Sequence, residues 1–168
     1  MLYPLLGFKD AAFPAGIGWH DRIQLGVPRL ALWGLARALQ VPVAEVATLV
    51  GVPLTELVWK ERKELLSRDV SAQLYRIAVA LHRLYVVLPT PAVAAAWLKV
   101  PRKELDGAVP IRLLLTQPGS DTVFAVITRI ASATSLPKVT RNAPEPEVVS
   151  DSADEVSPDL AESASPPF

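Results

Sequence analysis

The sequence predicts an all-α fold, and three observations support this. Between Pro28 and Leu136 apolar residues recur at spacings of three and four, as they do along one face of a helix. Prolines and glycines divide this region into short segments, and no stretch alternates apolar and polar residues for the length of a strand. With 168 residues, 51% of them hydrophobic, the chain can bury a core. We therefore expect a small helical bundle.

Composition divides the chain into four regions. Residues 1–26 are rich in Gly, Pro and aromatic residues without sustained periodicity, which indicates an irregular N-terminal arm. Residues 27–88 and 89–136 have the helical pattern. Residues 137–168 contain six prolines, many serines and acids, and few large apolar residues. Such a tail cannot bury enough surface to offset the entropy of ordering, so we expect it to be disordered on its own.

The first helical region holds four expected helices. Their limits follow from apolar spacing and from proline punctuation: Pro28 to about Leu39, Val43–Val50, Leu54–Leu65 and Asp69–Leu88. Pro28 stands where a first-turn proline is tolerated, and Ser67 or Asp69 is suited to cap the longest helix.

The second helical region holds three more. Thr90 before Pro91 is a cap followed by a first-position proline, and this helix should end near Leu98. Pro110 opens the next helix. The last should begin near Thr116–Ser120, with its apolar face formed by Val123, Phe124, Ile127 and Ile130.

Charge and residue content exclude several classes of protein. The tail has seven acids and two bases, a net charge of −5, whereas residues 1–136 have 15 bases and 10 acids, a net charge of +5. There is no cysteine, which excludes disulfides, thiolate metal sites and a cysteine nucleophile. His20 and His82 are the only histidines, and no Gly-rich phosphate loop is present, so we expect no enzyme, cofactor or metal. Without an export signal or a long apolar run, a cytoplasmic protein that does not span membranes is expected.

The segment Val43–Arg62 fits a helix-turn-helix. Ala47 is small enough to let two helices approach, and Gly51 permits a tight turn between them. The residues spaced to fill the gap between the helices are Val46, Val50, Val52 and Leu57. The alternative is an ordinary helical hairpin, in which Ala47 and Gly51 serve close packing alone.

DNA binding by this segment is a separate and weaker prediction. The second helix starts PLTELVW, where only Thr55 suits contact with base edges and Glu56 would repel phosphate. Lys60, Arg62 and Lys63 could contact phosphates, with little sequence information. A solvated basic face on a helix kept for packing is an equal alternative.

The segment Ala94–Ile130, AAAWLKVPRKELDGAVPIRLLLTQPGSDTVFAVITRI, resembles the toxin-binding domain of Xre/MbcA/ParS-type antitoxins. That family has Trp-Leu after a small-residue helix, a proline turn, Leu-Gly-Gly, a proline-led helix with two leucines, and a Thr-x-x-Gly step into a last amphipathic helix. The matching residues are Trp97, Leu98, Pro101, Leu105, Gly107, Pro110, Leu113, Leu114, Thr116, Gly119 and Val123. Asp106 replaces the first glycine, and Pro118 precedes Gly119. Because an Xre-like helix-turn-helix precedes this segment, the resemblance covers about Pro28 to Ile130.

The resemblance implies a ParS-like antitoxin of a RES–Xre type II toxin–antitoxin system. It would bind a RES-domain toxin, which degrades NAD or transfers ADP-ribose, and occlude the NAD-binding active site; autoregulation of the operon through operator DNA is a secondary expectation. The residues expected to contact the toxin are Lys99, Arg102, Lys103, Arg112, Arg129 and Ile130. The alternative is a helix-turn-helix transcriptional regulator whose C-terminal domain only dimerises. The apolar motif residues are also explained as core residues, without a role in binding.

Two further expectations concern association. The longest helix has apolar residues outside its main face, at Val79, Val86 and Val87, which favours a homodimer. In the tail, Asp151, Asp154 and Glu155 could imitate the phosphate charge of a dinucleotide in the toxin's cleft. The alternative for the tail is a segment that only maintains solubility.

Overall fold

The computed structural model describes Leu6 and residues 18–135, which form helices and no strand. The all-α prediction is confirmed for this part of the chain. The acidic tail, residues 137–168, and most of the N-terminal arm lie outside the described residues. Within the described part, no helix is both long enough and apolar enough to cross a membrane.

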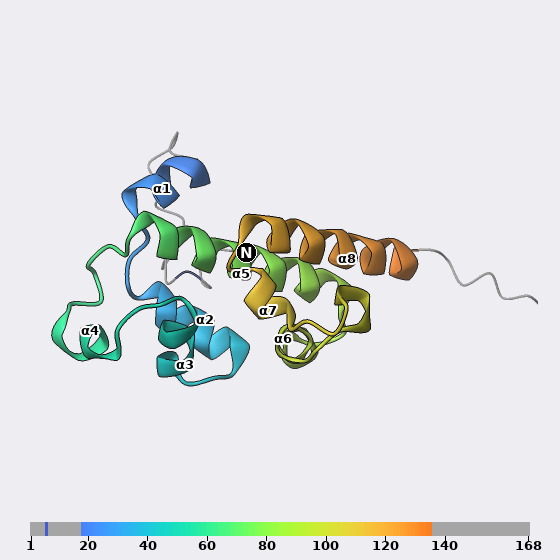
Figure 1. Cartoon of the computed structure of the whole chain (residues 1–168), viewed down its shortest axis with the longest axis horizontal. Coiled ribbons are helices and arrows are strands. Elements are labelled where there is room, and N and C mark those ends of the chain that lie inside the picture. The colour runs from blue at the N-terminus through green and yellow to red at the C-terminus, as the bar shows by residue number, and fades with distance from the viewer. Residues whose placement is uncertain (1–5, 7–17, 136–168) are drawn as a thin grey trace, which may run out of the picture. The chain divides into compact units, whose positions relative to one another are not determined.

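Eight α-helices and a short 3-10 helix follow one another in the described part of the chain. They are α1 (Trp19–Leu25), α2 (Ala31–Leu39), α3 (Val43–Leu49), α4 (Leu54–Trp59), α5 (Arg68–Val87), α6 (Pro91–Lys99), η2 (Lys103–Leu105), α7 (Pro110–Leu113) and α8 (Gln117–Ser135). Helix α5 packs against α1, α2, α6 and α8 (Figure 1). Both halves of the described chain therefore share one helix.

The core is built on the apolar face of α5. Leu74, Ile77, Leu81 and Leu84 of this helix are completely buried. They pack in one cluster with Leu6 and with buried residues of the other helices, among them Leu32, Leu35, Leu39, Leu98, Leu114 and Ile127. The expected cap of α5 is confirmed, because the Ser67 side chain accepts a hydrogen bond from the backbone N–H of Val70.

Two expected helix limits are wrong, and one pairing explains both. Helix α2 begins at Ala31 instead of Pro28, and α4 ends at Trp59 instead of Leu65. The excluded residues pair instead: Pro28 and Leu65 form an antiparallel bridge. The bonds on either side join the backbone N–H of Arg29 to the Glu64 carbonyl at 2.8 Å, that of Leu30 to Arg62 at 2.9 Å, and that of Leu66 to Val27 at 2.9 Å. Helical periodicity in the sequence could not reveal this non-local pairing.

The N-terminal region departs from expectation once more. Trp19–Leu25 form α1, although residues 1–26 were expected to be irregular. The Trp19 ring lies 5.1 Å from the ring of Tyr75 on α5, measured between centroids. Helix α1 has only about two turns and no buried residue. Because so short a helix is marginal on its own, we infer that its contact with α5 stabilises it.

Candidate functional site

Helix α6 holds the Trp-Leu pair against the core. As expected, Thr90 caps this helix, its Oγ1 accepting from the backbone N–H of Val93 at 3.2 Å, and Pro91 occupies the first turn. The small Ala94 lets α6 approach the core closely. Trp97 is 7% exposed and Leu98 is fully buried, so these two motif residues are core residues.

Arg102 fastens the turn that follows α6. Its Nε donates to the Trp97 carbonyl oxygen at 3.2 Å, and its guanidinium lies 5.1 Å from the centre of the Trp97 ring. The backbone of the turn closes on Arg102 as well, through bonds to Ala108 and Gly107. Asp106 and Gly107 both have left-handed backbone conformations, with φ of 55° and 78°. Asp is among the few residues that tolerate this region, which explains how it replaces the first glycine of the motif.

A second tight turn joins α7 to α8. Thr116 Oγ1 accepts from the backbone N–H of Gly119 at 3.2 Å. A Cβ on Gly119 would overlap the carbonyl oxygen of Leu113, so a glycine is needed for this close approach. The Thr-x-x-Gly step of the motif is therefore a packing device.

Arg76, on α5, holds the same turn from outside the motif. Its Nε donates to the Leu114 carbonyl oxygen at 2.9 Å and its Nη2 to that of Leu115 at 2.8 Å. Burial lowers the pKa of Arg76, against a smaller opposite effect of the Asp121 carboxylate. The end of α7 thus depends on a residue that the motif could not indicate, since it lies 38 residues earlier in the chain.

The six residues expected to contact a toxin do not form one cluster. Lys99 and Arg102 are engaged within the fold, since Lys99 Nζ donates to the Leu39 carbonyl oxygen at 2.9 Å. Lys103, Arg112 and Arg129 are exposed, whereas Ile130 is half-buried. Only Lys99 and Arg112 line the same cavity.

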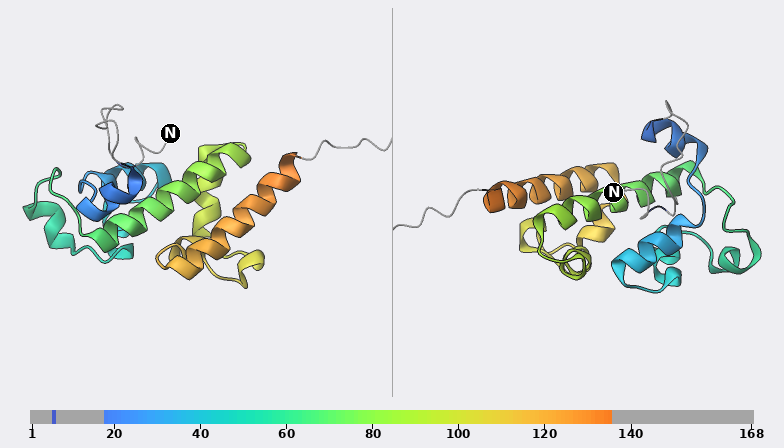
Figure 2. Two further views of the ribbon diagram at one scale, coloured as in Figure 1. Left: turned by 90° about the horizontal axis from the view of Figure 1, so that it is seen from above. Right: turned by 180° about the vertical axis from the view of Figure 1, so that it is seen from behind.

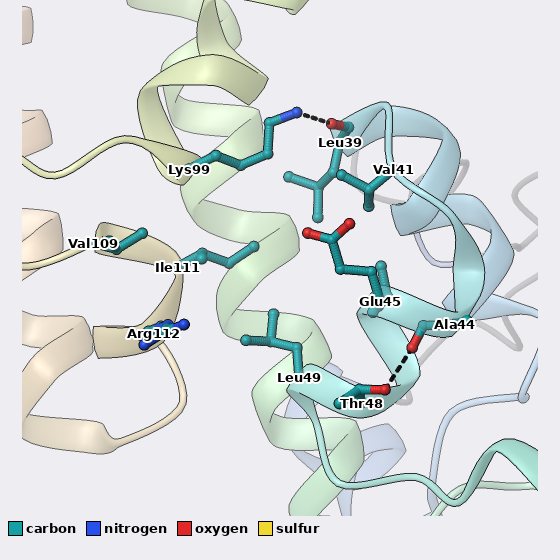
Figure 3. A pocket seen from close by; sticks show the side chains of 11 residues that line it. Leu39, Val41, Ala44, Glu45, Thr48, Leu49, Lys99, Val109, Ile111 and Arg112 are labelled. Carbon is teal, nitrogen blue, oxygen red and sulfur yellow. Dashed lines mark hydrogen bonds between the residues drawn. The ribbon is translucent and has the colours of Figure 1, made fainter.

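This cavity is a groove of about 550 Å³ between two parts of the chain (Figure 3). One wall comes from the end of α2, the loop after it and α3; the other comes from the end of α6 and from α7. The lining residues are Leu39, Val41, Ala44, Glu45, Val46, Thr48 and Leu49 on the first wall and Lys99, Val109, Ile111 and Arg112 on the second. The first wall could not be predicted from the sequence, because its residues lie 50 or more positions before those of the second wall.

The segment with α3 and α4 buries most of the residues expected to fill the gap between its helices, whereas Leu57 is half-buried. Ala47, Val46, Val50 and Val52 are buried, and Gly51 has a φ of 73° in the turn. The residues expected to contact DNA are divided. Thr55 and Lys63 are exposed, Lys60 pairs with Glu56 at 3.3 Å, and Arg62 lies over the ring of Trp33 at 4.7 Å.

Glu56 has a structural partner in this segment. It accepts a hydrogen bond from Arg29 Nη1 at 2.9 Å, and Arg29 is almost completely buried. This bond lowers the pKa of Glu56, with Lys60 contributing in the same direction. An acid at the start of α4, unfavourable for DNA, is thus explained by the need to neutralise a buried guanidinium. Three apolar side chains of α4 are also exposed: Leu54, Val58 and Trp59.

Comparison with known proteins bears on the second half of the described chain. Residues 83–132 match the family model described as the antitoxin Xre/MbcA/ParS C-terminal toxin-binding domain. No curated protein matched the chain. The matched residues comprise α6, η2, α7, nearly all of α8 and the end of α5, and they contain every motif residue named above. The family resemblance is confirmed for this segment: residues 83–132 are similar to an antitoxin toxin-binding domain, which supports an antitoxin role and a cognate toxin as partner.

Proposed function

We propose that this chain is an antitoxin that binds and neutralises a RES-domain toxin by occluding the toxin's NAD-binding active site. The observation that carries the proposal is the match of residues 83–132 to a toxin-binding domain. The matched family is one of binding domains and not of enzymes, so the proposed action is steric and electrostatic.

The exposed cations of this domain are the best candidates for contact with the toxin. Lys103, Arg112 and Arg129 are exposed, and none of them forms an ion pair or side-chain hydrogen bond with a described residue. Exposed cations at an interface rim raise the association rate and select the orientation of the partner. Lys99 and Arg102 are left with a structural role, and they support this surface indirectly.

Self-association and DNA binding are secondary parts of the proposal. Val86 is exposed on α5 and supports the expected homodimer, whereas Val79 and Val87 are half-buried. Operator binding has less support, because Lys60 and Arg62 already have partners within the fold. Any DNA affinity should therefore be weak and salt-sensitive.

Co-expression tests the proposal. The RES-type protein encoded beside this chain's gene should arrest growth alone, and co-expression of the full chain should restore growth and allow both proteins to be purified together. Arg129→Glu should weaken this complex, whereas Arg37→Glu, an exposed site on α2, is the matched control. Failure of wild type both to co-purify and to restore growth would refute the proposed function.

Two truncations test the manner of occlusion. A chain ending at Ser135 retains all the helices described, and one ending at Arg141 adds six residues without the acidic part of the tail. If both protect cells and suppress NAD turnover fully, the helices alone occlude the cleft. If only the full chain does so, the acidic residues of the tail are required.

A further inference from the structure

The groove between α3 and α7 carries opposite charges on its two walls. Glu45 projects from α3 and Arg112 belongs to α7, and both are exposed (Figure 3). Neither side chain forms an ion pair or hydrogen bond with a described residue, so they do not neutralise each other. Between them lie aliphatic side chains, among them Leu49 and Ile111.

The walls of the groove are joined at one end. Lys99, at the end of α6, reaches across to the carbonyl oxygen of Leu39 at the end of α2, at 2.9 Å. Helices α2 and α6 also pack directly against each other, and α2 packs against α3. The groove is therefore preformed, which lowers the entropic cost for anything that binds there.

The charges indicate the kind of occupant. A volume of about 550 Å³ suits one or a few side chains. A small anion would be repelled by Glu45 and a small cation by Arg112, so the best complement has both charges, separated by an apolar group. A polypeptide segment with a large apolar side chain between a basic and an acidic residue meets this requirement.

We propose that this groove receives such a segment of the toxin, with its carboxylate on Arg112 and its basic group on Glu45. The inference rests on the proposed function and extends it, because half of the binding site then comes from α2 and α3, outside the matched residues 83–132. The toxin would be held by both halves of the described chain at once.

Filling the groove tests the proposal. Ala44→Phe, in the wall of α3, places a ring where the toxin side chain should enter. Ala92→Phe is the matched control, because Ala92 is exposed on the first turn of α6 and does not line the groove. With an inactivated RES-type protein from the neighbouring gene as the probe, calorimetry should show at least about tenfold weaker binding for Ala44→Phe, as for loss of an interface hot spot, and no change for Ala92→Phe.

A charge reversal keeps the proposal testable if Ala44→Phe does not fold. Glu45→Arg changes an exposed side chain and should weaken binding, with the loss diminishing as salt is added. Glu61→Arg, at an exposed position after the end of α4 and outside the groove, is its control. Loss of binding with Glu45→Arg alone supports the groove.

The remaining outcomes separate the two proposals. If wild type binds the toxin and both Ala44→Phe and Glu45→Arg bind equally well, the groove proposal is overturned and the proposed function stands. If wild type does not bind the toxin, the proposed function is refuted, and the groove proposal, which rests on it, is refuted as well. If Ala44→Phe leaves toxin affinity unchanged but turns a dimer into a monomer in light scattering, a second copy of the chain occupies the groove, which also overturns the proposal.

Discussion

The domain from α6 to α8 and the segment around α4 use tryptophan in opposite ways. Trp97 is 7% exposed, and its ring lies against Arg102. Trp59, the last residue of α4, is 84% exposed, and the preceding Val58 is 77% exposed. In the ribbon views α4 lies at the edge of the described part, beside α3 (Figure 2). The same residue type anchors one region and projects into solvent from the other.

The charged residues of the two regions differ in the same sense. In the first, Arg102 donates to a main-chain carbonyl oxygen, and Arg76 of α5 donates to two more at the end of α7, so both charges hold turns of this domain. In the second, Glu56 is committed to Arg29 and Lys60, which leaves an apolar surface beside them. The family motif is therefore largely a packing motif: of its residues, only Pro101, Gly107 and Thr116 are exposed. The apolar surface of α4 is better suited to protein than to DNA.

The largest difference is expected when each of the two tryptophans is replaced by alanine in a separate variant. Trp97→Ala should destabilise the fold by about 3–5 kcal/mol, because it deletes a large buried side chain and leaves a cavity. Trp59→Ala should change stability by no more than about 0.5 kcal/mol, as at most exposed sites. Urea denaturation followed by far-UV circular dichroism measures both. Equal losses would mean that Trp59 is covered in solution, for instance by a second copy of the chain.

The next effect concerns Gly119, at the α7–α8 turn. On helix propensity alone, Gly→Ala within a helix should stabilise by about 1 kcal/mol. The clash with the Leu113 carbonyl oxygen should outweigh this gain, since overpacking costs about 1–3 kcal/mol. We therefore expect Gly119→Ala to lower the free energy of unfolding. Ala125→Gly, the reverse exchange at an exposed site of α8, should lower it too, but through helix propensity alone. A stabilised Gly119→Ala would show that the turn can open without cost.

Much of the fold could be read from the sequence because the signals are local. The Thr90-Pro91 start of α6, the Pro110 start of α7 and the beginning of α8 each depend on residues within one turn of the helix. The limits of α2 and α4 could not be predicted, because the Pro28–Leu65 pairing joins segments distant in sequence. Non-local hydrogen bonds overrode local helical periodicity there.

The candidate site was less predictable for a related reason. The sequence indicates which cationic residues the domain contains but not which of them form hydrogen bonds within the fold. Lys99 and Arg102 donate to carbonyl oxygens. The groove was missed because α3 and α7 become neighbours only through their packing around the core. Ala44 and Glu45 carry no local signal of a binding wall.

A smaller effect is expected at Arg76, which bonds the turn from α5. Arg76→Met keeps the aliphatic part of the side chain and removes two charge-assisted hydrogen bonds; since the site is partly open to solvent, we expect a loss of about 2 kcal/mol. Arg83→Met, which removes an exposed contact with the Phe124 ring, should cost at most about 1 kcal/mol. Hydrogen exchange should accelerate locally at the α7–α8 turn in Arg76→Met, and an unchanged turn would contradict the role assigned to these bonds.

The smallest effect is expected at Asp106, where this chain departs from the Leu-Gly-Gly pattern. Asp106 has a φ of 55°, a conformation that glycine adopts without steric cost. Asp106→Gly should relieve this strain, but the more flexible unfolded chain opposes the gain, so the net stabilisation should stay below about 1 kcal/mol. Asp106→Ala should lose about 1 kcal/mol, because alanine lacks the tolerance of Asp for left-handed backbone. Toxin affinity should be equal in wild type and Asp106→Gly if this position serves only the turn. Weaker binding by a stable Asp106→Gly would instead assign the carboxylate to the partner surface, next to the exposed Lys103 and Glu104 of η2.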